Sequence, residues 1–319
     1  MPCKLELSRG ARQVRGGSSE YIIIEVPSQQ LSSAGRLEVV ATPIGNLGDL
    51  TPRARAALAG ADLIAAEDTR RTAALLSAIG VSGTLISLHE HNEGGRIEGL
   101  LRELRAGKVV VLVSDAGTPL LSDPGYALVR AAAAAGIEIR AIPGPSALTA
   151  ALSIAGLPTD RFVFEGFLPA RAGERRSALA RLAAEPRTLL LFEAPHRIAA
   201  TLQELVQLFG PQRQAAVARE LTKLHEAVYR GTLEQLAAAA LSDPNFTRGE
   251  ITLMIEGLPA AADTGGDRAL LTRALKLLLS ELPPARAAAV AAQIAGVRRS
   301  EAYALAQQLR ALTAVEGDP

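Results

Sequence analysis

The sequence predicts an α/β fold in which two α/β domains are followed by a small all-helical domain. From Leu37 onward, short apolar runs alternate with longer segments of helical periodicity, a pattern typical of a sheet covered by helices. A linker at 156–161 contains Gly and Pro, and a second block with the same alternation follows it. From about residue 268 the apolar spacing is helical only. We therefore expect domains at 37–156, 157–258 and 268–314.

Residues 1–36 precede this pattern and differ from it. They carry Gly-Gly-Ser-Ser and Ser-Ser-Ala-Gly clusters without lasting periodicity. Segments of this composition bury too little apolar surface to offset the entropy of ordering. We expect a disordered or weakly ordered extension over 1–36.

The first domain contains five predicted strands, most of them continuous apolar runs that we expect to be buried on both faces. They lie at 37–42, 62–66, 85–88, 109–113 and 137–141. Thr51-Pro52 has the pattern of an N-cap followed by proline at the first helical position. Gly80, Gly107 and Gly136 stand where the intervening helices should end.

The second domain contains four predicted strands, at 162–167, 188–193, 215–219 and 251–255. Three helices are expected near 174–184, 196–209 and 232–241. A Gly/Ala/Pro-rich linker at 257–266 separates this domain from the tail. In the tail we expect three short helices, the second of which opens at Pro283-Pro284 and ends at Gly296. This pattern resembles a helix-turn-helix unit.

Composition sets limits on function. The chain has 319 residues, of which 48% are hydrophobic, enough apolar material for two cores. The formal net charge is +1, so an RNA partner would have to meet a local basic face. Aromatic residues make up 3% and Trp is absent, which argues against a base-stacking platform.

Cysteine content and hydropathy indicate the compartment. The single cysteine, Cys3, excludes a disulfide within the chain and a cysteine-based zinc site. No apolar run reaches the 18 residues of a membrane span. We expect a reduced, cytoplasmic, soluble protein with no membrane partner.

Polar or Gly/Pro-rich loops follow all five strands of the first domain. Because ligands bind beyond the carboxyl ends of parallel strands, five such loops predict a ligand cleft. Gly, Pro, Asp and Ser also simply make turns, and for any one loop this is the simpler interpretation. The loops are Thr42–Asn46, Glu67–Arg71, His89–Glu93, Ser114–Pro119 with Ser122–Gly125, and Pro143–Ser146.

Several motifs with known chemistry are absent from the sequence. There is no G-x-G-x-x-G, no G-x-x-x-x-G-K-[ST], no G-x-S-x-G and no H-E-x-x-H. His89-Glu-His91 has the alternation of an extended segment, and two histidines alone are too few for a metal site. We expect no metal.

The loop sequences together resemble one family. They include Ala41-Thr-Pro-Ile-Gly-Asn-Leu47, Ala65-Ala-Glu-Asp-Thr-Arg70, Ser87-Leu-His-Glu-His-Asn92, Val113-Ser-Asp-Ala-Gly-Thr-Pro119, Ser122-Asp-Pro-Gly-Tyr126, Pro143-Gly-Pro-Ser-Ala147, Glu165-Gly-Phe-Leu-Pro169, Phe192-Glu-Ala-Pro-His-Arg197, Ala218-Arg-Glu-Leu-Thr-Lys223 and Arg230-Gly-Thr232. In order and spacing, these motifs resemble the ribosomal RNA small subunit methyltransferase I family of the tetrapyrrole methylase superfamily. The resemblance covers about residues 37–257, and the tail is similar to that family's helical C-terminal domain.

This resemblance implies two α/β domains of the tetrapyrrole methylase type with S-adenosylmethionine (SAM) in the cleft between them, and a homodimer. It implies methylation of the ribose 2′-hydroxyl of cytidine 1402 in 16S rRNA, at the decoding centre of the 30S subunit. The implied partner is therefore RNA and not DNA.

The resemblance also implies which residues bind the cofactor, namely those that match the family's motifs in this sequence. These are Pro43, Ile44, Gly45, Asn46, Asp115, Ala116, Gly117, Thr118, Pro119, Ser122, Ser146, Ala147, Phe167, Leu168, Pro195, Arg219 and Glu220. Glu193-Ala-Pro departs from the Glu-Ser-Pro expected there, and Leu120 and Leu121 replace the usual Gly or Ala.

Loop position alone suggests the remaining site residues. A ribose hydroxyl needs a general base, for which Glu67, Asp68, His89 and His91 are candidates. The alternative for Glu67 is a structural ion pair with Arg70.

For RNA phosphates the candidates are Arg70, Arg71, Arg171, Arg175 and Arg176, with Arg298, Arg299 and Arg310 in the tail. A solvated charged face is the alternative for the arginine clusters at 171–181 and in the tail.

Two other functions stay open at this point. One is a small-molecule, tetrapyrrole-like methylase on the same fold, against which the Glu-Asp-Thr-Arg and His-Glu-His-Asn loops argue. The other is a non-catalytic RNA-binding protein of ribosome assembly, against which the intact 115–119 loop argues.

Overall fold

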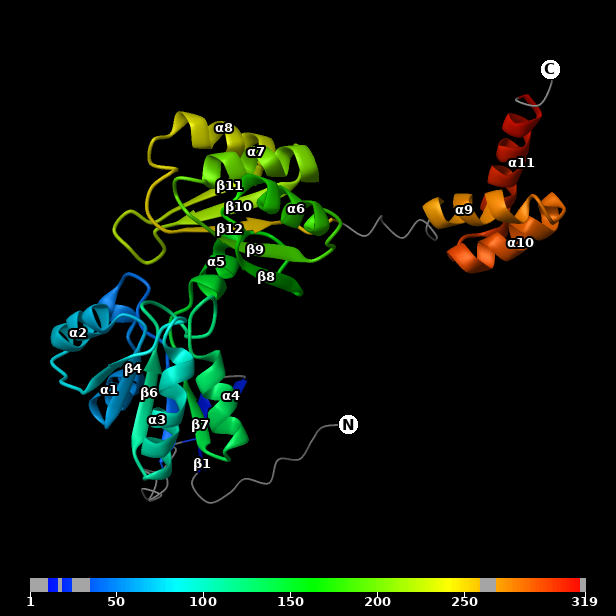
Figure 1. Cartoon of the computed structure of the whole chain (residues 1–319). Coiled ribbons are helices and arrows are strands. Elements are labelled where there is room, and N and C mark those ends of the chain that lie inside the picture. The colour runs from blue at the N-terminus through cyan, green and yellow to red at the C-terminus, as the bar shows by residue number, and fades with distance from the viewer. Residues whose placement is uncertain (1–10, 17–18, 25–34, 259–267, 316–319) are drawn as a thin grey trace. The chain divides into compact units, whose positions relative to one another are not determined.

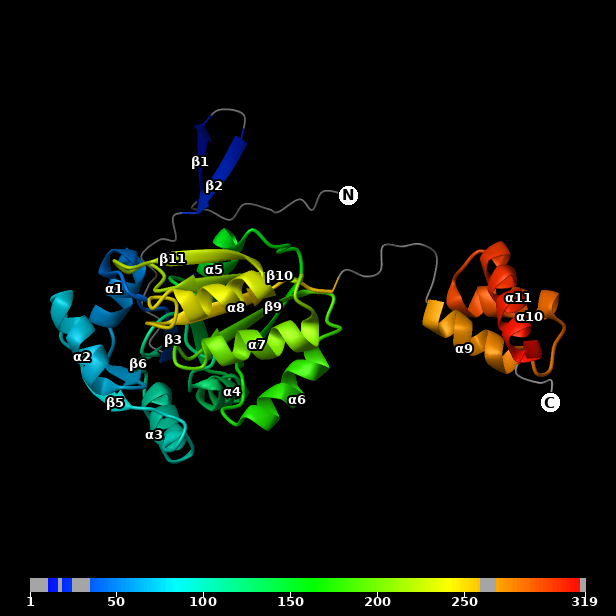
Figure 2. The same cartoon turned by 90° about the horizontal axis from the view of Figure 1, so that it is seen from above.

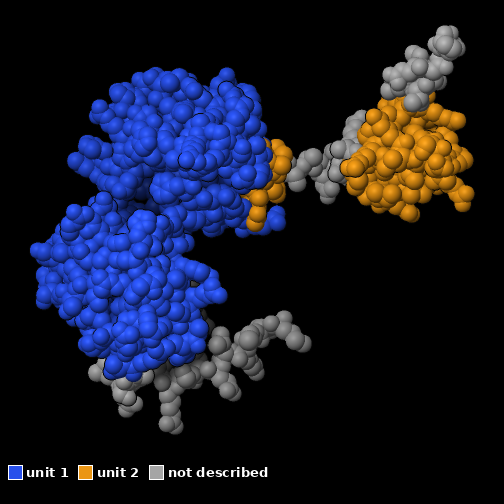
Figure 3. Space-filling model, in the orientation of Figure 1, with its two compact units in different colours: residues 1–182, 188–256 blue, residues 183–187, 257–319 orange. Residues whose placement is uncertain are grey.

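A computed structural model of the chain describes residues 11–16, 19–24, 35–258 and 268–315. The chain divides into two compact units (Figure 3). One consists of residues 1–182 and 188–256, and the other of residues 183–187 and 257–319. The first unit holds two five-stranded sheets, and the second holds three helices. This arrangement confirms the predicted fold class.

The first sheet is entirely parallel, with strand order β5-β4-β6-β3-β7. Its strands are β3 (Arg36–Val40), β4 (Leu63–Ala66), β5 (Leu85–Ser87), β6 (Val109–Val113) and β7 (Glu138–Ile142). The helices are α1 (Pro52–Ala59), α2 (Thr69–Ala78), α3 (Glu93–Arg105) and α4 (Tyr126–Ala134), with a 3-10 turn at Leu47–Asp49 (Figure 1). Because all five strands run the same way, their carboxyl ends meet at one edge.

Strand β6 shows why this sheet is buried on both faces. Val110 and Leu112 pack in one core with Leu104 of α3, whereas Val111 and Val113 pack in the other core. Successive side chains of a strand alternate between faces, so a continuous apolar run supplies both cores. The predicted helix starts and ends also agree with the structure. Thr51 caps α1, and Gly80, Gly107 and Gly136 have positive φ.

The second sheet is mixed, with strand order β11-β10-β12-β9-β8. Only β8 (Phe162–Phe167) and β9 (Thr188–Glu193) are parallel; β10 (Gln214–Arg219), β11 (Ala227–Thr232) and β12 (Ile251–Ile255) pair antiparallel. Helices α7 (Ile198–Phe209) and α8 (Leu233–Ser242) lie side by side, and α6 (Ala172–Leu182) packs on α7 (Figure 2).

Helix α5 (Ala147–Ala155) joins the two sheets. It precedes the predicted domain boundary at 156/157, yet Leu148 and Leu152 pack against Leu190 and Met254 of the second sheet. Within the second sheet, the structure also contains one strand that was not predicted. Strand β11 is a half-buried edge strand, and its sequence Ala-Val-Tyr-Arg-Gly-Thr lacks the apolar run of a central strand.

Part of the predicted N-terminal extension has regular structure. Strands β1 (Ala11–Gly16) and β2 (Ser19–Ile24) form an antiparallel hairpin. Residues 1–10, 17–18 and 25–34 lie outside the described residues.

The second unit contains α9 (Arg268–Leu278), α10 (Pro284–Ala295) and α11 (Arg299–Val315). Its core consists mainly of leucine and alanine, among them Leu271, Leu275 and Ala291. Gly296 ends α10 with a φ of 67°, as the sequence predicts for a helix-turn-helix unit. In the part of the chain that the structure describes, no helix is both long and apolar enough to cross a membrane.

Candidate functional site

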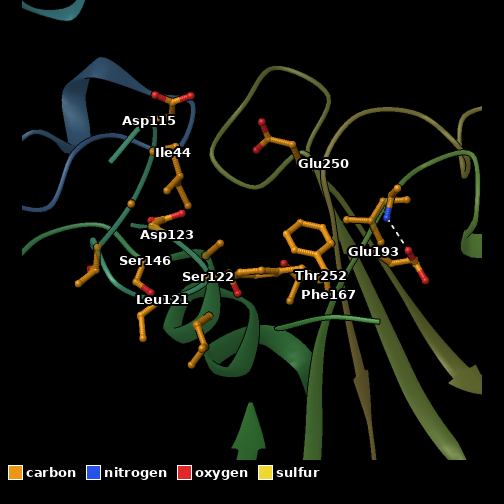
Figure 4. A pocket seen from close by; sticks show the side chains of 18 of the residues that line it. Ile44, Asp115, Leu121, Ser122, Asp123, Ser146, Phe167, Glu193, Glu250 and Thr252 are labelled. Carbon is orange, nitrogen blue, oxygen red and sulfur yellow. Dashed lines mark hydrogen bonds between the residues drawn. The ribbon is translucent and has the colours of Figure 1, made fainter. Parts of the chain in front are cut away.

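A cavity of about 500 Å³ lies at the carboxyl edge of the first sheet, where it meets the second sheet (Figure 4). This volume is within the range of small-molecule sites. Its wall is formed by Ile44, Glu67, Arg71, Asp115, Ala116, Gly117, Thr118, Leu121, Ser122, Asp123, Ser146, Ala147, Leu148, Phe167, Phe192, Glu193, Ala194, Pro195, Gly249, Glu250, Ile251 and Thr252.

The loops after β3, β4, β6 and β7 form the first-sheet wall, as expected for a parallel sheet. The opposite wall comes from the ends of β8 and β9 and from the start of β12. The Phe167 ring is 59% exposed and lies 5.5 Å from the ring of Phe192, so an aromatic face is available at this wall.

A short backbone bridge holds the 115–119 loop beside the loop after β3. The N–H of Thr42 donates to the carbonyl of Gly117 at 2.9 Å, and the N–H of Gly117 donates to the carbonyl of Thr42 at 3.0 Å. Gly117 has a φ of 81°, which favours glycine. A Cβ there would lie 3.3 Å from Cγ2 of Ile44, so glycine also keeps this corner of the cavity open.

Lys223 extends from the second-sheet domain over the loop after β3. A Cβ on Gly45 would overlap the Lys223 side chain, so this close crossing requires glycine. The Lys223 ammonium binds Glu220 at 2.9 Å and Glu250 at 3.2 Å. These contacts brace the rim of the cavity, although Gly45 and Lys223 do not line it.

An acidic network connects the loops after β4 and β6. The Asp115 carboxylate accepts the N–H of Asp68 at 3.0 Å and contacts the Arg71 guanidinium at 3.2 Å. The N–H of Asp115 in turn donates to Oε2 of Glu67 at 3.2 Å. Burial raises the pKa of Glu67 above its usual value. The predicted alternative for Glu67 was an ion pair with Arg70. In the structure, Arg70 pairs with Asp68 instead.

Asp68 is poorly suited to act as a base, contrary to one of our predictions. Its carboxylate caps α2 by accepting the N–H of Arg70 at 2.8 Å, and it binds the Arg70 guanidinium at 2.8 and 3.1 Å. The side-chain hydrogen bond from Arg70 is the largest cause of a pKa lowered to about 2. A carboxylate with so low a pKa is a weak proton acceptor. Arg70 itself points outward with 89% of its side chain exposed.

His89 and His91 do not line the cavity. The prediction of an extended segment at His89–His91 is wrong, because residues 90–92 form a turn that leads into α3. The Asn92 side chain causes the turn, since it accepts the N–H of His89 at 2.9 Å. Among the base candidates, the structure therefore brings only Glu67 to the cavity wall.

Sequence reasoning missed Asp123. It lies in the Ser122-Asp-Pro-Gly segment after β6 and lines the cavity. Burial raises its pKa to about 6, and the nearby charges of Glu67 and Asp115 add to the shift. The signal was present as an aspartate in a loop at the carboxyl edge, but it resembled an ordinary turn.

The structure divides the predicted cofactor residues into two groups. Ten of them line the cavity: Ile44, Asp115, Ala116, Gly117, Thr118, Ser122, Ser146, Ala147, Phe167 and Pro195. The other seven do not: Pro43, Gly45, Asn46, Pro119, Leu168, Arg219 and Glu220.

Two of the residues outside the wall have other roles. Arg219 is 8% exposed and donates to the carbonyl of His225 at 2.8 Å. Glu220 accepts the N–H of Glu250 at 2.9 Å in addition to its contact with Lys223.

Among the predicted RNA contacts, Arg175 has a structural role. Its guanidinium is 7% exposed and forms two hydrogen bonds with Glu204, at 2.8 and 2.9 Å, so it is not available to a phosphate. Arg171 and Arg176 are exposed at the protein surface, where they contact Glu174 and Gln207. Arg71 lines the cavity beside Asp115.

Glu193 supports the wall formed by residues 192–195, a role that the sequence did not predict. Its side chain is fully buried and accepts hydrogen bonds from Arg197 at 2.7 Å and from Thr201 at 2.6 Å. It also accepts the N–H of Ala194 at 2.7 Å. The carboxylate thus holds the backbone before Pro195 in place.

The cavity fits the cofactor that the resemblance implies. SAM carries a sulfonium cation, and the carboxylates of Glu67, Asp115 and Asp123 give the wall a negative potential. Gly117 permits close approach to the backbone, and Phe167 adds an exposed aromatic side chain to the wall. Across the described residues, no group of three or more His, Cys, Asp or Glu could hold a metal ion.

Comparison with known proteins shows the family and the fold. The model of the family described as Tetrapyrrole (Corrin/Porphyrin) Methylases matches residues 36–237, and that of the RsmI C-terminal HTH domain matches residues 260–310. Ribosomal RNA small subunit methyltransferase I of Xylella fastidiosa is 51% identical over 274 residues, covering 86% of this chain and 99% of that protein. The protein of the same name from Escherichia coli O157:H7 is 48% identical over 279 residues, covering 87% and 97%.

Solved structures show the shared fold at lower identity. The methyltransferase CobJ is 22% identical with a TM-score of 0.52, covering 70% of this chain and 95% of that one. Cobalt precorrin-4 methyltransferase is 19% identical with a TM-score of 0.51, covering 72% and 97%.

Proposed function

Because the chain belongs to the ribosomal RNA small subunit methyltransferase I family of the tetrapyrrole methylases, we propose that it methylates the ribose 2′-hydroxyl of cytidine 1402 in 16S rRNA. The acceptor is the decoding centre of the assembled 30S subunit, and SAM is the methyl donor. The enzyme acts in the cytoplasm as a homodimer.

The cavity at the carboxyl edge of the first sheet is the observation that carries this proposal. Ten of the predicted cofactor-binding residues converge on it from both α/β domains, although they are far apart in the sequence. A site of this size with acidic groups beside apolar ones suits a cationic nucleoside.

The protein contributes mainly by positioning the reactants. SAM, when bound, supplies an electrophilic methyl group. The loops at 115–119 and 192–195 hold the donor site in a defined shape, because backbone hydrogen bonds and the buried Glu193 fix them. Alignment of the acceptor oxygen with the transferred group supplies a large part of the rate. A base near the acceptor hydroxyl adds about 10²–10⁴-fold.

The helical unit has the charge expected of an RNA-binding surface. Between residues 268 and 315 the sequence has seven Lys or Arg and two Glu, although the whole chain is nearly neutral. Arg298 and Arg299 are exposed at the start of α11, directly after the Gly296 turn. Exposed arginines of this kind bind phosphates and release counterions.

The double charge reversal Arg298→Glu/Arg299→Glu should therefore weaken binding to 30S subunits by about 10-fold or more at moderate salt. The salt dependence of the affinity should become shallower, because fewer phosphates are contacted. Filter binding over a salt series measures both quantities. The matched control is Arg53→Glu/Arg55→Glu on α1, which changes the net charge equally at exposed positions. Equal losses in the two variants would contradict a specific contact by the tail.

Methyl transfer from radiolabelled SAM to 30S subunits that lack the modification tests the proposed function. Label at a single ribose, mapped to cytidine 1402, is the expected result. Label on another nucleotide would contradict the proposed target. SAM binding without label on 30S would favour one of the two other functions, and incubation with tetrapyrrole substrates separates a small-molecule methylase from a non-catalytic binder.

A further inference from the structure

We propose that Asp123 is the general base that takes the proton from the acceptor hydroxyl. This inference rests on the proposed function, because it assigns a role within the same reaction. It differs from our sequence-based candidates, of which only Glu67 reaches the cavity.

The position of Asp123 supports this role. It lies on the first-domain wall of the cavity, facing the side on which Phe167 and Thr252 lie (Figure 4). The following residues, Pro124 and Gly125, are buried, so the loop that carries Asp123 is anchored from behind. A Cβ on Gly125 would lie 2.7 Å from the Leu112 side chain, which shows how closely this loop packs on β6.

Two of the other wall carboxylates are paired with cations. Asp115 contacts the Arg71 guanidinium and accepts a backbone N–H. Glu193 is paired with Arg197. A cationic partner favours the charged form of a carboxylate and makes it a weaker proton acceptor.

Glu250 and Glu67 are the remaining two wall carboxylates. Glu250 binds the Lys223 ammonium and is exposed at the rim. Glu67 accepts the backbone N–H of Asp115, a contact that stabilises its charged form and opposes the burial that raises its pKa. Unlike Asp115, Glu193 and Glu250, Asp123 forms no ion pair with a described residue.

The electrostatic surroundings of Asp123 match the requirement for a base. Burial raises its pKa to about 6, and repulsion from Glu67 and Asp115 acts in the same direction. Arg71 is the cation that lines the same wall, and it forms an ion pair with Asp115. A carboxylate with a pKa just below neutral is mostly ionised at pH 7 and is still more basic than an ordinary aspartate.

In the proposed step, the methyl group passes from SAM to the oxygen of the acceptor hydroxyl. The acceptor oxygen forms a bond to the methyl carbon while the bond between that carbon and sulfur breaks. The electron pair of the broken bond stays on sulfur, and the hydroxyl proton passes to the Asp123 carboxylate. After product release the proton passes to water, and the carboxylate is regenerated.

The test is the substitution Asp123→Asn, which preserves the size of the side chain but removes the basic group. The single-turnover rate on 30S subunits should fall by about 100-fold or more. The Kd for S-adenosylhomocysteine, measured by calorimetry, should change by less than about threefold. The wild-type rate should increase with pH up to about 6, and this dependence should be absent from the variant. Asp160→Asn is the matched control, because the Asp160 side chain is 79% exposed.

A second readout does not depend on turnover. Because the folded state holds the Asp123 proton more tightly than the unfolded chain, ionisation of this group destabilises the fold above pH 6. This destabilisation is relieved as the pH falls through about 6 towards 4. Asn carries no charge, so the variant should have a higher Tm than the wild type at pH 8, and the difference should close towards pH 4.

The possible outcomes separate the two proposals. No label on 30S with the wild-type enzyme contradicts the proposed function. An active wild type together with an equally active Asp123→Asn variant contradicts the role of Asp123 alone. Loss of S-adenosylhomocysteine binding in the variant would make Asp123 a cofactor ligand, and a Tm difference independent of pH would exclude a buried titrating carboxylate. Either result overturns the inference.

Discussion

Replacement of Arg197 by Met is expected to lower the free energy of unfolding by about 3–5 kcal/mol. The Glu193 carboxylate is completely buried, and Arg197 is its cationic partner. Without the guanidinium, the hydrogen bonds from Thr201 and from the N–H of Ala194 remain, but the buried negative charge is uncompensated. Chemical denaturation of the purified protein, followed by circular dichroism, measures the change.

Arg161→Met is the control for this prediction. Arg161 forms an ion pair with Asp160 at 3.8 Å in which both side chains are mostly exposed, so its loss should cost less than about 1 kcal/mol. Arg197→Met should also reduce SAM affinity, because Glu193 positions residues 192–195 of the cavity wall. If Arg197→Met and Arg161→Met lower the free energy of unfolding equally little, the buried pair of Glu193 and Arg197 does not support the loop at 192–195.

Gly117→Val is expected to weaken the binding of SAM by about 10- to 100-fold, which corresponds to about 1.4–2.8 kcal/mol. Gly117 has a φ of 81°, a region that is strained for a side chain branched at Cβ. The added atoms would contact Ile44 and occupy the cavity corner that the Thr42–Gly117 bridge shapes. Isothermal calorimetry with S-adenosylhomocysteine measures the loss.

A matched control separates backbone strain from obstruction of the cavity. Gly136 has a φ of 68°, and a Cβ there would meet nothing within 4 Å. Gly136→Val should therefore destabilise the fold and leave ligand affinity close to that of the wild type. Unchanged affinity in Gly117→Val would show that the bound ligand does not reach this corner.

Strand β6 and strand β11 show where sequence patterns predict structure and where they do not. The five apolar residues at 109–113 favour a strand buried on both faces, and the structure confirms the strand and its bounds. Residues 227–232 form an edge strand whose side chains are half-buried, so their sequence has no strong alternation or apolar run. Their pairing depends on β10, which tertiary folding places beside them.

The base candidates illustrate the same limit within the site. Glu67, Asp68, His89 and His91 all follow strands at the correct edge, which a sequence pattern can indicate. It cannot indicate which side chain turns inward, because local hydrogen bonds decide this. Asp68 is held by Arg70, and Asn92 places His89 in a turn.

By itself the sequence determined the fold class, most elements of the first sheet, the family and the sheet edge at which the cavity lies. These follow from local periodicity, from capping residues and from motifs that can be read without knowing contacts. The tertiary structure alone decided that Asp123 lies half-buried in the cavity wall, that Arg175 is paired with Glu204, and that Glu193 supports the wall from within. The physical reason is that burial and charge pairing join residues far apart in the chain, and both the pKa of a carboxylate and the availability of an arginine depend on those partners.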